Sequence, residues 1–313
     1  QGYWGQPEAT ESAFIILDGK RFLRSGDLAR VDEDGYFFMV DRLKRMINAS
    51  GFKVWPAEVE ALIAREGADR IGGFIAEPIQ ASGGIIVPPE GYLKRMWEVC
   101  QRHDILFIAD EVVTSFGRLG HWFSSWDEFG VMPDMVATAK GLTSGYVPLG
   151  AMIMSDRIWD VMAQGGHRWF TTGFTYSGHP VSCAAALKNI EIMEREDLLG
   201  NAARVGTYFE TRLAGLSDLP LVGDVRGRKL MMCVESVANK ETKALLPDEA
   251  NESKRISDYA ESLGLMVRPL GHLNVMSPAL TITEGEVDFV VETLGKAIAK
   301  VTDDLVREGY RVG

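Results

Sequence analysis

The sequence has few of the residues that build cross-linked or metal-bound proteins. Cysteine occurs three times in 313 residues, at Cys100, Cys183 and Cys233, and these positions lie far apart. An odd number of scattered cysteines fits a reducing compartment better than a disulfide framework. The five histidines are scattered too, and no two of them lie four residues apart. A metal centre is therefore not expected.

Long hydrophobic runs and clustered positive charge are also missing. No apolar run reaches the roughly eighteen residues that would indicate a membrane span, although hydrophobic residues make up 46% of the sequence. The net charge of -11 comes without a basic patch, which argues against a nucleic-acid partner. No basic-then-apolar signal opens the chain. We therefore expect a soluble, cytoplasmic protein with no membrane partner, whose substrates are small molecules.

The beginning of the chain differs in pattern from the rest. Two segments carry an Asp-Gly pair beside β-favouring residues, at Asp18-Gly19 and Asp34-Gly35, which predicts hairpins. The stretch "WPAEVEALIARE" then predicts a helix that begins near Pro56. Residues 1–66 are therefore expected to form a short α+β segment.

Beyond residue 71, short apolar runs end in polar residues or glycine, and helical patterns separate them. Four of these runs are "IGGFIAEP", "ILFIADE", "DMVATAK" and "LGAMIMS". Strands that are apolar throughout and alternate with helices predict an α/β fold with a mostly parallel sheet and helices on both faces. A long helix is expected to begin at Pro180. The last third, from about Leu216, has strand-like segments and a terminal helix capped by Thr283 and Glu286, which predicts a smaller α+β domain.

Two charged residues end two of these apolar runs, Asp110 and Lys140. Because the ligand crevice of an open parallel sheet lies beyond the carboxyl ends of its strands, we expect both side chains at one edge. A partly desolvated lysine amine can form an imine with an aldehyde, and an aspartate can keep a pyridine nitrogen protonated. Pyridoxal phosphate needs both groups. Taken alone, the two residues also fit a solvated strand end and a helix cap.

Four longer motifs extend this pattern: "FIAEPIQASGGIIVPPEGYL", "LFIADEVVTSFGRLG", "PDMVATAKGLTSGYVPLGA" and "GFTYSGHPVSCAAAL". In order and spacing they resemble the class III pyridoxal-phosphate-dependent aminotransferases over residues 67 to about 310, especially the branch acting on ω-amino acids and amines with pyruvate. The resemblance implies a fold type I transferase with pyridoxal 5'-phosphate as cofactor. It also implies a partial cofactor-binding large domain at 67–215, a small domain at 216–313, and a homodimer.

The resemblance assigns roles to individual residues. Lys140 would be the Schiff-base lysine and the general acid/base, Asp110 would pair with the pyridine nitrogen, and Val112 would pack on the ring. Phe174 and Thr175 would reach across the dimer interface, where the threonine would bond the partner's cofactor phosphate. From the residues alone, Thr175 also fits a cap for the helix at Pro180.

Two further residues are implied near the substrate. Glu77 in "AEP" would lie near the site, although an ordinary strand-end carboxylate fits that position equally. Arg268 would receive a substrate carboxylate, because a guanidinium fork bonds a carboxylate through two donors and a long side chain can swing away. Arg226 in "GDVRGRKL" is a rival for the same role, with glycine neighbours that suggest a structural turn.

The chain departs from the family pattern in two respects. Ser115 in "TSFGR" stands where the family usually has glycine, which affects the expected loop geometry near Phe116. Upstream of "AEP", family members carry a Gly-Ser turn that holds the cofactor phosphate and an aromatic residue that stacks on the ring, and this sequence has neither. Because backbone N–H groups at a helix start are a principal phosphate anchor, we expect reduced cofactor affinity.

The opening segment resembles a different family. The stretch "FLRSGDLARVDEDGYFFMVDRLKRMINASGFKVWPAEVEALI" looks like the hinge region of the adenylate-forming acyl-CoA ligases, over residues 1 to about 63. That resemblance implies that Asp27 and Arg42 hold an adenylate ribose and that Lys44 is the hinge. The ligase phosphate loop and catalytic lysine are missing. The alternative to a transaminase is therefore a non-functional or fused fragment of a fatty-acyl-CoA ligase.

Overall fold

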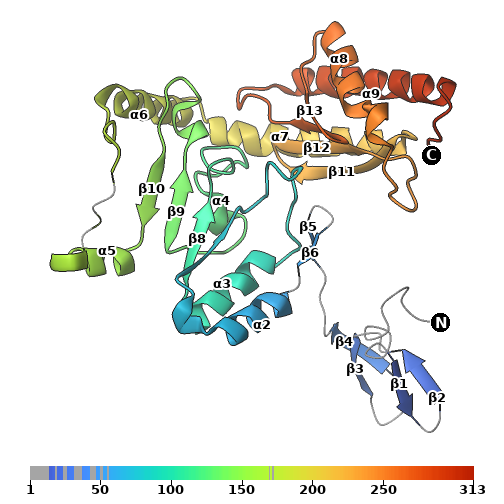
Figure 1. Ribbon diagram of the computed structural model, residues 1–313. Helices are drawn as coiled ribbons and strands as arrows, with labels where there is room; N and C mark the ends of the chain where they lie inside the picture. Colours follow the sequence, from blue (N-terminus) through green and yellow to red (C-terminus); the bar gives the residue numbers. More distant parts are fainter. Residues whose placement is uncertain are drawn as a thin grey trace. The chain divides into compact units, whose positions relative to one another are not determined.

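The computed structural model describes residues 14–17, 20–23, 27–31, 37–42, 47–49, 52–54 and 56–313 except 169, 171 and 172, and describes side chains from residue 59 onward. The chain forms two compact units, Gln1–Arg65 and Glu66–Gly313. Figure 1 labels the helices and strands of both.

The first unit contains three antiparallel strand pairs followed by a helix. The pairs are β1 (Phe14–Leu17) with β2 (Lys20–Leu23), β3 (Asp27–Val31) with β4 (Phe37–Arg42), and β5 (Ile47–Ala49) with β6 (Phe52–Val54). Helix α2 follows at Pro56–Glu66. The first two pairs flank the two Asp-Gly positions, as the hairpin prediction requires, and the Asp-Gly residues themselves lie outside the described residues.

The second unit begins with a four-stranded sheet in the order β10-β9-β8-β7. Its strands are β7 (Gly73–Ala76), β8 (Leu106–Asp110), β9 (Met135–Thr138) and β10 (Ala151–Met154). Strands β7, β8 and β9 are parallel, and β10 runs antiparallel to β9. The run "LGAMIMS" was expected in the parallel part of the sheet. It becomes an antiparallel edge strand because the chain returns from β9 through the short 3-10 helix η2 (Lys140–Thr143) and no crossover helix.

Helices connect the strands of this sheet. Helix α3 (Tyr92–Arg102) packs against β8 and buries Leu93, Met96, Val99 and Cys100, which recur at helical spacing. The remaining elements up to residue 195 are η1 (Ala68–Arg70), α4 (Ser124–Asp127), α5 (Asp156–Met162), η3 (Gly166–Arg168) and α6 (Pro180–Arg195). Helix α6 begins at Pro180 as predicted, because proline has no N–H to lose in the first turn.

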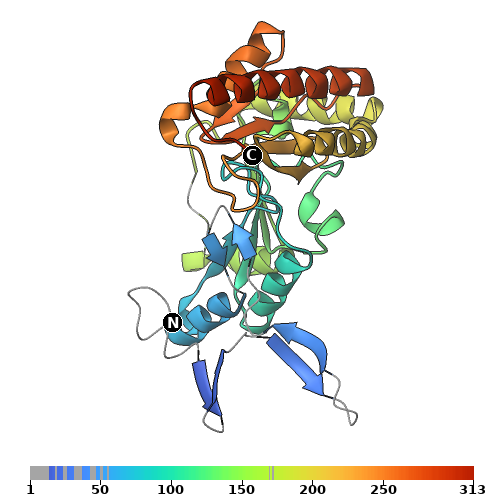
Figure 2. The same ribbon diagram turned by 90° about the vertical axis from the view of Figure 1, so that its right-hand side faces the viewer.

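The second sheet is antiparallel throughout, in the order β11-β12-β14-β13. Its strands are β11 (Val222–Arg228), β12 (Met231–Ser236), β13 (Arg268–Leu270) and β14 (Leu273–Met276). Helices α7 (Leu198–Ala214), α8 (Glu252–Ser262) and α9 (Glu284–Arg307) lie along this sheet (Figures 1 and 2). The short 3-10 helices η4 (Gly215–Asp218) and η5 (Asp248–Ala250) complete the set.

An apolar core fills the space between these helices and the second sheet. Phe209 of α7, Val234 of β12, Ile256 of α8 and Leu294 of α9 are all fully buried in it. Each such side chain contributes about 1.5–3 kcal/mol through removal from water. Helix α7 precedes residue 216 and still belongs to this core, and the domain boundary at residue 216 stays a prediction.

The predicted capping box at the start of α9 is confirmed. The Thr283 hydroxyl accepts the Glu286 N–H, and the Glu286 carboxylate accepts the Thr283 N–H at 2.8 Å. The Thr283 hydroxyl also donates to the Glu286 carboxylate at 2.8 Å. The backbone N–H and the hydroxyl of Thr283 both favour the charged carboxylate, so the pKa of Glu286 lies below its ordinary value.

No helix in the described part of the chain is long and apolar enough to span a membrane. The same residues contain no group of three or more histidine, cysteine or acidic side chains arranged to hold a metal ion.

The three thiols differ in exposure, which predicts different reactivity. Burial raises the pKa of Cys100 to about 11 and that of Cys233 to about 12, whereas Cys183 on α6 is half-exposed. Because the thiolate is the nucleophile, iodoacetamide at pH 8 should label Cys183 and spare the other two, as read by peptide mass spectrometry. Urea-unfolded protein, the control, should be labelled at all three; labelling of Cys233 at the Cys183 rate in folded protein would contradict this burial.

The same shifts fix the direction of the pH dependence of stability. Both folded-state pKa values lie above the ordinary value of 9.0, so the folded chain keeps thiol protons that the unfolded chain loses. The free energy of unfolding should therefore fall as the pH rises above 9, while the contribution is complete below it.

Candidate active site

The carboxyl edge of the parallel sheet carries both Asp110 and Lys140. Asp110 is the last residue of β8 and lies opposite Ala137 of β9 in the parallel register. The Glu111 N–H donates to the Ala137 carbonyl at 2.9 Å, which extends the ladder by one residue. Lys140 follows two residues after the end of β9. The register therefore brings both chain segments to one edge of the sheet, as the sequence pattern predicts.

Lys140 begins a strained turn. Its φ is 42° and that of Ser144, which ends η2, is 49°, so both residues occupy the left-handed region that non-glycine residues rarely adopt. Such conformations cost about 1–3 kcal/mol each and persist where the surroundings enforce them. They concentrate at functional sites, so the strain at Lys140 agrees with a functional role.

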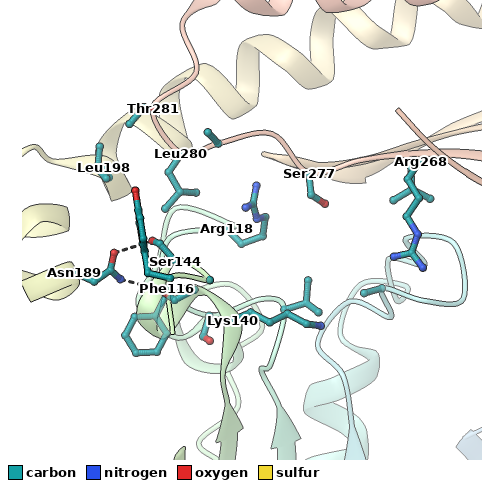
Figure 3. Close-up of a pocket in the computed structure, with 18 of the residues that line it drawn as sticks. Phe116, Arg118, Lys140, Ser144, Asn189, Leu198, Arg268, Ser277, Leu280 and Thr281 are labelled. Carbon is teal, nitrogen blue, oxygen red and sulfur yellow. Dashed lines mark hydrogen bonds between the residues drawn. The ribbon is translucent and has the colours of Figure 1, made fainter. Parts of the chain in front are cut away.

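Asn189 of α6 holds this turn in place. Its side-chain amide donates to the Gly141 carbonyl at 2.9 Å and to the Leu142 carbonyl at 3.1 Å. Its side-chain oxygen accepts the Ser144 hydroxyl at 2.7 Å. Figure 3 shows Asn189 joined to Ser144 in the pocket that Lys140 lines. One side chain thus satisfies three polar groups of η2 and fixes the backbone from which the lysine extends.

The carboxylate of Asp110 is oriented by the loop that follows it. The Val112 N–H donates to Asp110 Oδ1 at 3.1 Å, and both side chains are half-buried. This bond uses Oδ1, so Oδ2 of Asp110 remains the oxygen that can accept from a ligand.

Glu111 is the next residue and holds the loop of residues 111–125 together. Its carboxylate is fully buried and accepts the Ser124 N–H at 2.9 Å, the Ser125 N–H at 2.7 Å and the Thr114 hydroxyl at 2.9 Å. The Ser125 hydroxyl also donates to it. Four donors satisfy this buried carboxylate, which ties residues 111–125 into one unit.

Ser115 joins this loop to the strand that leads to Lys140. Its hydroxyl lies 2.5 Å from the Glu111 carbonyl and 2.6 Å from the Thr138 hydroxyl. The next residue, Phe116, has a φ of 52°, and a Cβ at Gly141 would lie only 2.9 Å from the Phe116 Cβ. The serine that departs from the family pattern therefore bridges two segments that are in close contact.

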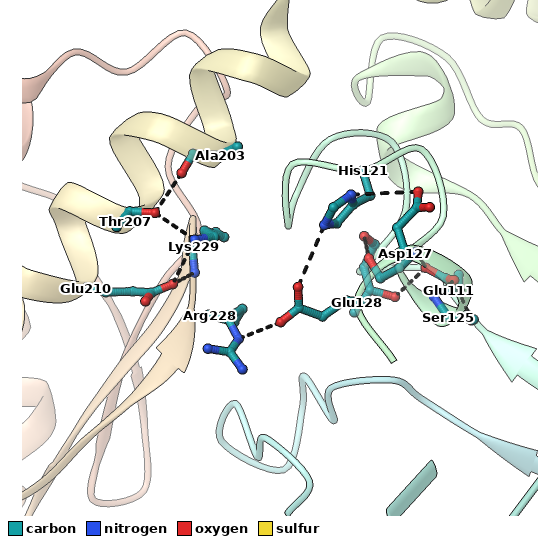
Figure 4. A network of polar contacts seen from close by, with 12 residues as sticks. Glu111, His121, Ser125, Asp127, Glu128, Ala203, Thr207, Glu210, Arg228 and Lys229 are labelled. Carbon is teal, nitrogen blue, oxygen red and sulfur yellow. Dashed lines mark hydrogen bonds and ion pairs between the residues drawn. The ribbon is translucent and has the colours of Figure 1, made fainter. Parts of the chain in front are cut away.

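A chain of polar side chains connects the loop to the second sheet (Figure 4). Glu128 forms an ion pair with Arg228 of β11 at 2.9 Å and lies 3.7 Å from His121, which in turn lies 3.7 Å from Asp127. Pairs of this kind fix position more than they add stability when they are partly exposed.

A pocket of about 750 Å³ opens beside Lys140, within the second unit. Its lining comes from the ends of both sheets and from α6, and includes three basic side chains, Arg118, Lys140 and Arg268, against one acidic side chain, Glu196. Lys140 and Arg268 extend toward the same space from different sheets (Figure 3). The pocket is thus locally basic in a chain with a net charge of -11, a combination that suits anionic ligands.

The other predicted residues lie in different surroundings. Glu77 is half-buried and accepts the N–H of Ala81, which lines the pocket, at 2.9 Å. Val112 and Asp110 lie at the sheet edge and are not among the lining residues. Phe174 and Thr175 are exposed, the phenylalanine by 84%.

The rival arginine, Arg226, is already occupied. Its Nε donates to the Gly84 carbonyl at 2.8 Å, and its Nη1 pairs with Asp224 at 3.0 Å and with Glu235. Arg226 joins β11 to the turn at residue 84 and does not line the pocket. The glycine-flanked position therefore has the structural role that its neighbours suggested.

Three residues implied by the ligase resemblance lie in the first unit. Asp27 and Arg42 are register partners in β3 and β4. Their side chains, and the whole of Lys44, lie outside the described residues.

Comparison with known proteins decides the family. The family model described as aminotransferase class III matches residues 36–298. This chain is a class III aminotransferase by family. The match begins inside the segment that resembles the ligase hinge, and that second resemblance stays a prediction.

Individual aminotransferases agree with this family. The chain is 42% identical to the diaminobutyrate–2-oxoglutarate transaminase of Halomonas elongata over 81% of this chain and 55% of that enzyme. It is 41% identical to the putrescine–pyruvate aminotransferase of Pseudomonas aeruginosa over 79% of this chain and 54% of that enzyme. The chain therefore spans about half the length of the curated relatives that it matches.

Solved structures show the same fold. An amine transaminase from an uncultivated Pseudomonas species, determined in its PLP-bound form, superposes with a TM-score of 0.76 at 45% identity, over 79% of this chain and 56% of that one. A thermostable (S)-enantioselective ω-transaminase from Thermomicrobium roseum gives a TM-score of 0.76 at 43% identity, over 79% and 55%. The fold type I expectation is thereby confirmed for the matched part.

Replacing Glu111 tests how much the hydrogen bonds of its buried carboxylate contribute to stability. Glu111→Ala leaves two buried N–H groups without an acceptor, and we expect it to lower the free energy of unfolding by about 3 kcal/mol in urea titrations. The control Glu191→Ala removes an exposed carboxylate of α6 that pairs with Lys188, and should change stability by less than about 1 kcal/mol. Equal effects in the two variants would show that the Glu111 contacts do not stabilise the loop.

Proposed function

We propose that this chain is a pyridoxal-phosphate-dependent transaminase with Lys140 as its catalytic amine. The observation that carries the proposal is the placement of Lys140: a lysine on a strained, externally fixed turn, at the same sheet edge as Asp110, beside a basic pocket. The family adds support, because its named relatives are transaminases.

The side chains present fit the cofactor. An amine at position 140 and a carboxylate at position 110 are the two groups that the aldehyde and the ring nitrogen need, and the sheet register brings their backbones together. When bound, pyridoxal phosphate supplies an aldehyde that condenses with amines and a ring that withdraws electrons from the substrate. Val112 would pack on the ring, and Thr175 of the partner subunit would bond the phosphate.

Two of the chain's own residues would then act on the reacting groups. Asp110, oriented by the Val112 N–H, keeps a proton on the ring nitrogen because a carboxylate favours the protonated form. The Lys140 amine would act as the general base that takes the proton from the substrate carbon bearing the amino group, and as the general acid that gives it back. Glu77, held by the Ala81 N–H, lies near the site.

Arg268 is proposed to bind the substrate carboxylate. It lines the pocket at the start of β13, and its side chain is exposed and able to swing away when the substrate is an uncharged amine. We therefore propose an ω-amino acid or amine as amino donor and an α-keto acid such as pyruvate as acceptor. The names of the relatives, which include diaminobutyrate, putrescine and γ-aminobutyrate transaminases, support a donor with a terminal amine.

We further propose a homodimer, a large domain at 67–215, a small domain at 216–313, and a cytoplasmic location, which free cysteines fit. Phe174 and Tyr176 are two neighbouring aromatic side chains that are exposed to solvent, and Thr175 between them is exposed too. Exposed aromatic patches are typical of protein contact surfaces, which supports the dimer.

The proposal is tested by the visible absorption band of lysine-bound cofactor. Adding excess pyridoxal phosphate to the chain should produce the band, and Lys140→Ala should abolish it and lower any transamination rate by about a hundredfold to ten-thousandfold. Lys188→Ala, which removes another exposed lysine on α6, is the matched control and should keep the band. A band of full strength in Lys140→Ala would refute the assignment of the amine.

The dimer is tested by light scattering after size exclusion. We expect a mass of twice 34.5 kDa. Phe174→Asp should raise the dimer dissociation constant by about tenfold or more, because a charge would replace an aromatic side chain that the proposed dimer covers. The control Phe289→Asp changes an exposed phenylalanine of α9 and should leave the dimer intact. A monomer that binds cofactor at full strength would refute the role of Thr175.

A further inference from the structure

Strand β13, which begins with Arg268, is held weakly by its own sheet. It has only three residues, and among the described strands it pairs with β14 alone, as an edge of the second sheet. Its middle residue, Pro269, has no N–H to donate to a neighbouring strand. The ladder therefore supplies few hydrogen bonds, and the position of β13 depends on contacts from outside the sheet.

Helix α8 supplies such contacts at both ends of the strand. The Ser257 hydroxyl donates at 2.7 Å to the carbonyl of Val267, just before the strand. The Ser253 hydroxyl donates to the carbonyl of Gly271, just after it. The Asn274 side-chain amide donates back to the Ser253 carbonyl at 2.9 Å. The first two turns of α8 thus hold the hairpin of β13 and β14.

A carboxylate and an imidazole complete this set of contacts at the turn of the hairpin. His272 lies in the turn between β13 and β14, and its Nδ1 is 2.6 Å from Oε1 of Glu252, the first residue of α8. Because a carboxylate only accepts hydrogen bonds, Nδ1 is the donor. The Glu252 side chain is 1% exposed and that of His272 19%. Little water can replace either partner, so the loss of this contact would be costly.

The hairpin held in this way forms one wall of the pocket beside Lys140. Arg268 and Val275, which are register partners, line the pocket together with Ser277, the residue after β14. Figure 3 shows Arg268 and Lys140 extending toward the same space. Because Arg268 and His272 belong to one short hairpin, a shift of its turn would move the guanidinium as well.

We propose that the contact between Glu252 and His272 positions Arg268, and thereby sets how strongly the pocket prefers amino donors with a carboxylate over amino donors without one. His272 is a positioning residue that acts through the hairpin. The inference rests on the role proposed above for Arg268. A guanidinium fork must meet both oxygens of a carboxylate in one plane, so a displacement of about 1 Å is enough to weaken the pairing.

The test compares 4-aminobutyrate with butylamine, which has a methyl group in place of the carboxylate. Loss of the absorption band of the lysine-bound cofactor follows the first half-reaction, and its dependence on amine concentration gives a maximum rate and a half-saturating concentration. His272→Ala should raise the half-saturating concentration of 4-aminobutyrate by about tenfold and leave its maximum rate within about twofold. Both values for butylamine should stay within about twofold, because butylamine has no carboxylate for Arg268 to bind.

Matched variants separate positioning from folding. His272→Asn keeps an N–H donor near the place of Nδ1 and should restore the half-saturating concentration of 4-aminobutyrate to within about twofold. The control His103→Ala changes an exposed histidine at the end of α3 and should alter neither substrate. Arg268→Met should raise the value for 4-aminobutyrate by itself, and adding His272→Ala to it should have no further effect.

A variant that removes both partners covers a failure of His272→Ala to fold. Glu252→Met combined with His272→Ala removes the buried carboxylate together with its hydrogen-bond donor, which is less costly than leaving one partner unsatisfied. The double variant should show the same rise for 4-aminobutyrate and none for butylamine.

A second measurement needs no cofactor. Amide hydrogen exchange of residues 265–276, read by mass spectrometry, should be about tenfold faster in His272→Ala than in the unaltered chain, because the hairpin opens more often when its turn is released. Peptides from β11 are the control and should exchange at the unaltered rate.

Three results would overturn the inference. Equal rises for 4-aminobutyrate and butylamine in His272→Ala would show that the contact only supports the fold. A further loss on adding His272→Ala to Arg268→Met would show that His272 does not act through the arginine. Unchanged hydrogen exchange of residues 265–276 would show that the contact does not hold the hairpin.

Failure of the proposed function gives a different result. An unaltered chain that never forms the cofactor band would refute the transaminase proposal, and with it the preference among amino donors. Hydrogen exchange would still decide whether the contact between Glu252 and His272 holds the hairpin that carries Arg268.

Discussion

The candidate site depends on the three hydrogen bonds between Asn189 and the turn that carries Lys140. Left-handed backbone at Lys140 and Ser144 is unfavourable by itself, and the amide of Asn189 satisfies the carbonyls and hydroxyl that the turn presents. Helix α6 is thereby coupled to the sheet edge. The position of the amine is set by a helix that lies 40 or more residues further along the chain.

A second constraint is the balance of charge. The chain as a whole is acidic, yet the pocket is lined by three basic side chains and one acidic one. Outside the pocket, several arginines of the second unit form ion pairs, such as Arg226 with Glu235 and Arg228 with Glu128. The excess of basic over acidic side chains in the pocket lining suits a negatively charged ligand.

Much of this arrangement could be predicted from the sequence, where the signal is local. Apolar runs that end on Asp110 and Lys140 indicated the common sheet edge, and Thr283 with Glu286 indicated the start of α9. Contacts over long separations could not be predicted. Asn189 has no local signature that ties it to Gly141, 48 residues away, and the carbonyl partners of Arg118 lie 112 and 160 residues from it. The antiparallel direction of β10 was not predicted, because the sequence between β9 and β10 does not show whether the chain crosses the sheet or turns back beside β9.

The serine at position 115 carries a consequence for how relatives of this chain can differ. The Ser115 hydroxyl has one hydrogen, which it donates to the Glu111 carbonyl. The Thr138 hydroxyl is therefore the donor, and the Ser115 oxygen the acceptor, in the bond between the two hydroxyls. With glycine at position 115, the Thr138 hydroxyl would have no acceptor there. With a non-polar residue at position 138, the Ser115 oxygen would lose the hydroxyl that donates to it. The residue types at positions 115 and 138 therefore depend on each other, and we expect correlated substitutions at the two positions among relatives of this chain.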